Sequence, residues 1–229
     1  GCFRQCGGIQ SVTIPSTCTS VGTQSFMACE KLSEFKVNSG SNYLKAENGV
    51  LFSSDGKTLV CYPSGKGGDY TIPSTVTTVN PYAFSQATKI GTLTIPASVV
   101  NMTFDDSGSS IMTTADQIKV DGSNPNFCDI NGVLCSSDKK KLLSYPARRT
   151  YGLNNAAYQV PDGITTIAPR AFYVGSVRSI DLNDVETIGN SAFQFSYALE
   201  SVKIGEKVSK IEEAAFTGCG KLSSITVED

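Results

Sequence analysis

The feature that most constrains this chain is an internal repeat of 22 to 23 residues. Apolar and small side chains recur at the same offsets in five copies, which start at Ile14, Ile72, Val160, Leu182 and Ile204. Burying a large apolar side chain contributes roughly 1.5–3 kcal/mol. Ordering each residue of a copy costs roughly 1–2 kcal/mol. A copy has many more residues than large apolar side chains, so it is unstable alone. The repeat therefore predicts copies that stack and cover each other's apolar faces in one elongated solenoid.

Each copy ends in an apolar-polar-apolar triplet. The triplets lie at 12–14, 35–37, 70–72, 93–95, 118–120, 158–160, 180–182, 202–204 and 225–227. Alternation with period two predicts a short strand with one buried face, and stacked copies would pair these strands in a parallel ladder. An Ala-Phe pair, as in Tyr82-Ala83-Phe84, predicts a short helical turn that buries the phenylalanine. The expected class is α/β and β-rich.

Two insertions extend the period, because Val37 to Ile72 spans 35 residues and Val120 to Val160 spans 40. Both contain Asn-Gly-Val-Leu followed by Tyr-Pro, with turn residues between. We expect β-hairpins at about 44–63 and 127–146, which pair 50–52 with 59–62 and 133–135 with 142–145. The copy at about 96–117 lacks the Ala-Phe pair, and we expect irregular structure there, with a loop from Asp105 to Ser110.

The composition excludes several functions. The chain has no histidine, which removes histidine-dependent triads and histidine-containing zinc sites. A net charge of -2 means that the chain has no excess of positive charge to attract the phosphates of a nucleic acid. No run of about 18 apolar residues predicts a membrane span. No cofactor motif is present, and the adjacent carboxylates Asp105-Asp106 and Glu212-Glu213 do not form an acid-base pair.

The eight cysteines lie at 2, 6, 18, 29, 61, 128, 135 and 219, without a CxxC pair. Three of them follow a phenylalanine by three residues, and the equivalent slots elsewhere hold Ala87, Gly175 and Ser196. A slot that accepts these residues requires a small side chain. We expect buried free thiols, with disulfides or metal ligands as the alternatives.

The segments Ile72–Val79 with Tyr82-Ala83-Phe84, and Ile211–Leu222, resemble the BspA-like leucine-rich repeats, also called the Treponema pallidum-type class. The resemblance covers nearly the whole chain. It implies a leucine-rich-repeat solenoid with a parallel strand ladder, short helical turns and two inserted β-hairpins. It also implies a non-catalytic protein of a host-associated microbe, at the cell surface or extracellular, used for adhesion or protein recognition. The family carries no fixed catalytic or ligand residues to transfer.

We expect a single leucine-rich repeat domain over 1–229, and a monomer. Cys2-Phe3-Arg4-Gln5-Cys6 fits the interior of a repeat. We therefore expect a fragment of a longer chain, from which a signal peptide was removed, with or without earlier repeats.

The first candidate binding surface is the ladder face, formed by the middle residue of each triplet. Its candidate residues are Lys36, Thr71, Thr94, Lys119, Gln159, Asp181 and Lys203, with Thr13 and Thr226 at the ends. A stacked strand surface is broad and rigid, which suits recognition. The alternative is a merely solvated sheet face, because the row holds no Trp, Tyr or Phe.

The second candidate surface is a basic cluster in and after the second hairpin. It comprises Lys139, Lys140, Lys141, Arg148 and Arg149. Such a cluster favours an acidic partner or an anionic glycan. The alternative is a solubilising surface.

Three functions follow. The first is an interaction module that binds a protein, such as host extracellular matrix or another microbial surface protein. The second is a structural spacer that presents another domain. The third is a glycan-binding accessory, which exposed aromatic side chains on one face would favour.

Overall fold

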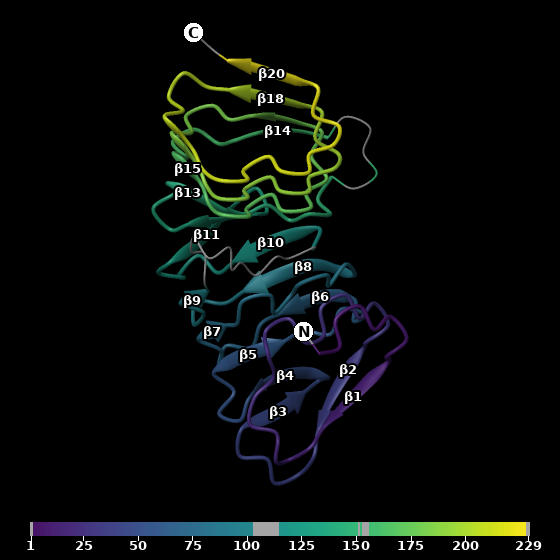
Figure 1. The fold of residues 1–229 in the computed structure, drawn as a ribbon. Helices are drawn as coiled ribbons and strands as arrows, with labels where there is room; N and C mark the ends of the chain where they lie inside the picture. Colours follow the sequence, from purple (N-terminus) through teal and green to yellow (C-terminus); the bar gives the residue numbers. More distant parts are fainter. Residues whose placement is uncertain (1, 103–114, 151, 153–155, 228–229) are drawn as a thin grey trace.

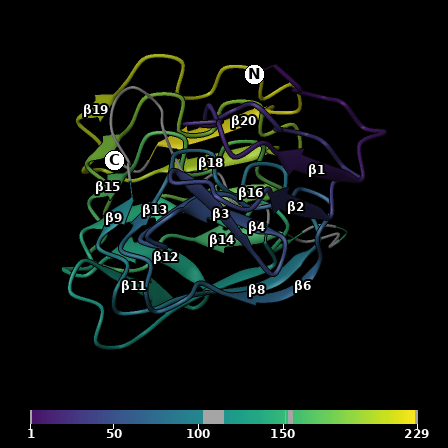
Figure 2. The same cartoon turned by 90° about the horizontal axis from the view of Figure 1, so that it is seen from below.

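The chain winds into a solenoid of about nine coils in a computed structural model that describes residues 2–102, 115–150, 152 and 156–227. The coils stack along one long axis, with the last coil at the top of Figure 1. Viewed along that axis, the coils lie over one another (Figure 2). The predicted stacking of repeat copies is confirmed.

One edge of the stack carries the main ladder, with one strand for each predicted triplet. Its strands are β1 (Ser11–Ile14), β2 (Glu34–Val37), β6 (Gly68–Thr71), β8 (Ile90–Ile95), β10 (Gln117–Val120), β14 (Ala157–Gln159), β16 (Ser179–Asp181), β18 (Ser201–Ile204) and β20 (Ser224–Val227). They pair in parallel as three separate sheets, β1-β2, β6-β8-β10 and β14-β16-β18-β20. The ladder is thus interrupted twice, each time at an insertion.

A second edge carries the side ladder and both insertions. Its first sheet holds β3 (Leu44–Glu47), β4 (Val50–Ser53), β5 (Thr58–Cys61), β7 (Thr78–Val79) and β9 (Asn101–Met102). Its second sheet holds β11 (Phe127–Ile130), β12 (Val133–Ser136), β13 (Lys141–Ser144), β15 (Thr166–Ile167), β17 (Thr187–Ile188) and β19 (Lys210–Ile211). The antiparallel pairs β4-β5 and β12-β13 confirm the predicted hairpins. Each insertion contains one further strand, β3 or β11, that the sequence did not predict.

The Asn-Gly turns of the insertions explain why the main ladder stops there. Asn131 and Gly132 both have positive φ, 51° and 80°, as a tight type I′ hairpin turn requires. The amide of Ile118 in β10 donates to the carbonyl of Gly132 at 3.0 Å. In the first insertion the amide of Phe35 donates to Gly49 in the same way, at 2.8 Å. The turn therefore takes backbone hydrogen bonds that a following ladder strand would otherwise make.

The third edge carries the Ala-Phe segments, where the predicted helical turns are wrong. The described residues contain turns but no helix. In the copy around Phe172, the amides of 170, 172 and 174 donate to the next coil, and those of 171, 173 and 175 each donate to the carbonyl three residues earlier, which closes a four-residue turn. Arg170 and Val174 also have positive φ, 55° and 53°. A helix directs its amides along its own axis, so this alternation excludes one.

The core holds the predicted phenylalanines, except that Phe216 in the last copy is half-buried. Phe84, Phe172 and Phe193 are fully buried. Tyr145 takes the place of a phenylalanine in the coil of the second insertion, because its ring stacks on Phe172 at 4.8 Å and its amide donates to Ala171. The rings of Tyr145, Phe172, Phe193 and Phe216 thus form one column through the C-terminal coils.

The irregular copy at about 96–117 is described only in part. Val99 is fully buried, and β9 and β10 lie on either side of the gap. The predicted loop from Asp105 to Ser110 lies outside the described residues.

Candidate functional site

The ladder-face residues lie in register, side by side across neighbouring strands. Thr71 pairs with Thr94, and Thr94 with Lys119. In the C-terminal sheet Gln159 pairs with Asp181, which pairs with Lys203. Lys36 pairs with Thr13 in the N-terminal sheet. The structure therefore divides the predicted row among three sheets, of which the C-terminal one is the largest in the main ladder.

These side chains face away from the core, as the triplet pattern requires. Lys36, Thr71, Lys119 and Gln159 are exposed, and Thr94, Asp181 and Lys203 are half-buried. The neighbours Ile180 and Val202 in the same strands are 2% and 1% exposed. The alternation thus places polar side chains on the surface and buried apolar side chains beneath them.

A shallow depression of about 410 Å³ lies on the ladder face over β14, β16, β18 and β20. Its lining includes the C-terminal part of the predicted row, from Gln159 to Thr226, and a second row of small residues, Ala157, Ser179, Ser201 and Ser224, which are also in register. The sequence analysis missed this second row. Its signal was present, because a small residue precedes the triplet in each of these four copies.

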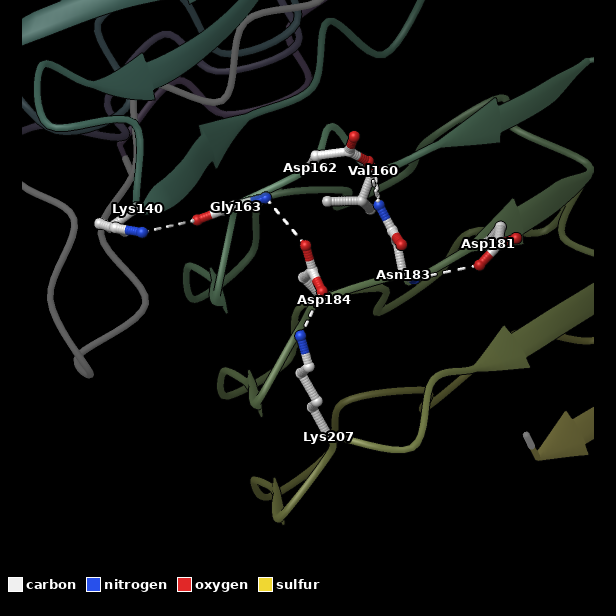
Figure 3. Close-up of polar contacts among 8 residues, drawn as sticks. All are labelled: Lys140, Val160, Asp162, Gly163, Asp181, Asn183, Asp184 and Lys207. Atoms are coloured by element: carbon white, nitrogen blue, oxygen red, sulfur yellow. Dashed lines mark hydrogen bonds and ion pairs between the residues drawn. The ribbon is translucent and has the colours of Figure 1, made fainter. Parts of the chain in front are cut away.

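The charges in this depression are paired. Lys203 Nζ lies 3.0 Å from Asp181 Oδ2. The other oxygen of Asp181 accepts a hydrogen bond from the Asn183 amide at 3.0 Å, as Figure 3 shows. Both side chains are therefore held in position, which lowers the ordering cost when a partner binds.

The structure does not bring the predicted basic cluster together. Lys139 and Lys140 lie at the turn before β13 and Lys141 is its first residue, whereas Arg148 and Arg149 follow its far end. From Lys141 to the end of the strand at Ser144, three steps of roughly 3.3 Å span about 10 Å. The two halves of the predicted cluster thus lie on either side of β13, and binding by them stays a prediction.

Several members of the basic cluster have structural contacts. Lys140 Nζ donates to the Gly163 carbonyl at 3.4 Å, and the Gly163 amide donates to Asp184, which also binds Lys207 (Figure 3). This chain of contacts joins successive coils. Arg148 donates to the Thr88 carbonyl and lies 3.5 Å from Asp116. Arg149 lies at the junction between β10 and β14.

An aromatic patch projects from the Ala-Phe edge. It comprises Tyr173, Phe195 and Tyr197, with ring centroids 5.9 Å apart in each neighbouring pair. Tyr197 is 59% exposed. A mostly apolar groove of about 280 Å³ lies beside the patch and includes Ala147 and Val174 in its lining. The sequence analysis did not single out these side chains.

All eight cysteines are free thiols, but only Cys29 and Cys135 are fully buried. The expectation of free thiols is confirmed, and that of uniform burial is wrong. Burial raises the pKa of the Cys135 thiol to about 12, so this thiol is not a nucleophile at neutral pH. In the part of the chain that the structure describes, no cluster of carboxylates and thiols could hold a metal ion.

Comparison with known proteins identifies the repeat. The model of the BspA type leucine rich repeat region matches residues 1–53, 61–123 and 151–229, in six copies. This chain belongs to that family. Leucine-rich repeat domains generally mediate protein interactions. No curated protein matches the chain.

Two solved structures share the fold. A leucine-rich repeat protein from Eubacterium ventriosum is 23% identical, with a TM-score of 0.68, and the match covers 96% of this chain and 60% of that one. The pneumococcal vaccine antigen PcpA is 20% identical, with a TM-score of 0.54, and the match covers 96% and 51%. The chain thus spans less than two thirds of either solved chain.

No helix in the described ranges is long and apolar enough to cross a membrane.

Proposed function

We propose that this chain is a non-catalytic module that binds a protein through the ladder face of β14, β16, β18 and β20. The observation that carries the proposal is the depression over these strands, where two rows of polar and small side chains lie in register above a buried apolar base. Such a surface is preorganised, because the backbone ladder fixes the spacing of every side chain. Membership of a repeat family that generally mediates protein interactions supports this reading.

The partner class that we propose is an extracellular protein, either of the host matrix or on another microbe, bound by a monomer at the cell surface or outside the cell. Short polar side chains and one paired charge suit an extended peptide segment. The seven predicted ladder residues would then contribute unequally, with Gln159, Asp181 and Lys203 at the site and the others outside it.

An array of extracellular matrix proteins, probed with this chain, tests the proposal. Ser201→Arg would fill the centre of the depression, and we expect it to abolish capture of any protein that the wild type binds. The control is Ser209→Arg, which places the same side chain at an exposed position on the side-ladder edge and should leave capture unchanged. Equal capture by both variants would contradict the ladder-face site, and no capture by the wild type would favour the spacer function.

Glycan binding is a second candidate, which the exposed aromatic patch favours. The rings of Phe195 and Tyr197 are nearly parallel, with an interplanar angle of 24°, and form a platform on which a sugar ring could stack. Tyr197→Ala tests it on a glycan array, with Tyr43→Ala as the control, since Tyr43 is similarly exposed at 50%. Loss of glycan signal only in Tyr197→Ala would support this second function. Turnover in a hydrolase screen would contradict the non-catalytic assignment.

A further inference from the structure

The junction between two sheets of the main ladder forms a second depression, distinct from the one over β14–β20. It lies where β10 and β14 fail to pair, and its volume is about 450 Å³. The side chains that line it include Asp116, Gln117, Tyr145, Arg149, Thr150 and Tyr158.

Tyr145 and Tyr158 bring two hydroxyls to this junction. Tyr145 is 2% exposed and its ring meets that of Tyr158 at 4.9 Å. The Tyr145 hydroxyl lies beside Arg149 and Thr150. Among the described residues, however, neither tyrosine hydroxyl completes a hydrogen bond. Leaving a buried donor without a hydrogen-bond partner costs free energy. The two hydroxyls would therefore donate to an acceptor that enters the depression.

The junction also carries the positive charge of Arg149. Asp116 is paired with Arg148, at 3.5 Å. For Arg149, by contrast, no carboxylate of the described residues lies within ion-pair distance. Its guanidinium lies over the Asn-Gly turn, where a Cβ on Gly132 would be 2.7 Å from Nη1. A fixed guanidinium with two hydroxyl donors suits a carboxylate.

The first insertion provides an internal comparison, because it repeats the tyrosine pair. Tyr62 and Tyr70 lie 4.7 Å apart, centroid to centroid. There the chain supplies its own carboxylate, because the pKa of Tyr70 is raised first by burial, then by Tyr62, and also by the nearby charge of Glu47. Glu47 stands two residues before the turn glycine Gly49, and Ile130 stands at the same position before Gly132. The second junction therefore has the tyrosine pair and Arg149, but isoleucine stands where the first has Glu47, and its own carboxylate, Asp116, is paired with Arg148.

We propose that the second junction binds the carboxylate of an acidic side chain in a peptide segment that lies along the ladder face. Ala157 and Tyr158 line both depressions, so one extended segment reaches from the junction across β14–β20. This inference rests on the proposed protein-binding function and names a chemical requirement of the partner.

The test measures fluorescence anisotropy with a labelled Glu-Gly-Ser repeat peptide and its Gln-Gly-Ser counterpart. We expect the glutamate peptide alone to bind, and binding to weaken as salt is added. Arg149→Gln should lower the affinity by about tenfold or more, the usual result of removing a charged donor. Tyr158→Phe removes one hydroxyl and should lower it less. Lys141→Gln removes the same charge at the exposed start of β13 and should leave the affinity within about twofold of the wild type.

Equal losses in Arg149→Gln and Lys141→Gln would overturn the proposal, because they would show non-specific attraction. So would equal binding of both peptides, or binding of alginate, a uronic-acid polysaccharide, in place of the glutamate peptide. Thermal melting establishes that each variant is folded, and Tyr158→Phe keeps the ring that the core requires. If Ser201→Arg abolishes protein capture while Arg149→Gln changes neither capture nor peptide binding, the carboxylate site is wrong and the proposed function stands.

Discussion

The third residue after each buried phenylalanine shows how one side chain joins two coils. The thiols of Cys29 and Cys219 donate to the carbonyls of Phe3 and Phe193, each at 3.1 Å. Ser196 donates to the Phe172 carbonyl at 2.6 Å in the same way. The slot therefore favours a small side chain that can also donate a hydrogen bond. The requirement for small size was visible in the sequence, whereas the carbonyl belongs to the preceding coil and was not.

Phe193→Ala should lower the free energy of unfolding by roughly 3–5 kcal/mol, because the ring fills the space between two stacked rings and would leave a cavity. Thr94→Ala on the ladder face should change it by less than about 0.5 kcal/mol. Urea titration followed by circular dichroism measures both. Equal effects would show that the assignment of inside and outside is wrong.

Asp184 should make part of the stability acid-sensitive. Its hydrogen bond to Lys207, and then that to the Gly163 amide, lower its pKa below the ordinary 3.8. A folded-state pKa below the unfolded value stabilises the fold above the unfolded pKa, and this contribution is lost as the pH falls through the folded pKa. Asp184→Asn should therefore narrow the difference in unfolding free energy between neutral pH and about pH 3, relative to the wild type. Glu30→Gln, at an exposed carboxylate, is the control, and an unchanged difference in Asp184→Asn would contradict the prediction.

Each of the two insertions interrupts the main ladder and still continues the solenoid. β13 joins the side ladder through β15, and Tyr145 continues the column of rings. Each insertion therefore adds two strands to a coil and keeps its remaining contacts. The main-ladder strands on either side of an insertion do not pair with each other. In the second insertion, the missing pairing between β10 and β14 leaves the junction where Arg149 lies.

Gly132→Ala should be more destabilising than Gly163→Ala. Both glycines have φ of 80°, so each substitution meets the same backbone strain, on the order of 1 kcal/mol. Only at Gly132 would the new Cβ also approach Arg149 Nη1 at 2.7 Å and Gln117 Cβ at 3.1 Å. Urea unfolding of the two variants gives the comparison. Equal losses of unfolding free energy in the two variants would show that Arg149 moves away from the new Cβ at little cost and is not fixed at the junction.

At the scale of the whole molecule, the described residues form two apolar clusters, and β4 lies between them. Val50 and Phe52 of β4 point into the larger cluster, and Leu51 points into the smaller N-terminal one. β4 is thus buried on both faces, which explains its unbroken run of apolar residues.

Leu51→Ala should destabilise the N-terminal coils selectively, at a cost of roughly 2–5 kcal/mol. Hydrogen exchange monitored by mass spectrometry should show faster exchange in β1, β2 and β3 and little change in β16 and β18, because coils contact only their neighbours. Val202→Ala in the C-terminal sheet should reverse the pattern. Uniform acceleration in both variants would mean that the solenoid unfolds as one unit.

The sequence by itself determined the coil, because a period of 22 to 23 residues with a phenylalanine and an alternating triplet can bury its apolar side chains only by stacking. The position of each ladder residue, the buried phenylalanines and the β4-β5 and β12-β13 hairpins followed from local patterns. The tertiary structure decided what depends on a neighbouring coil. Alternate amides of the Ala-Phe segments bond across coils, so no helix forms, and the Asn-Gly turns divide the ladder. Arg149 meets Tyr145 and Tyr158 only because one strand fails to pair with the next.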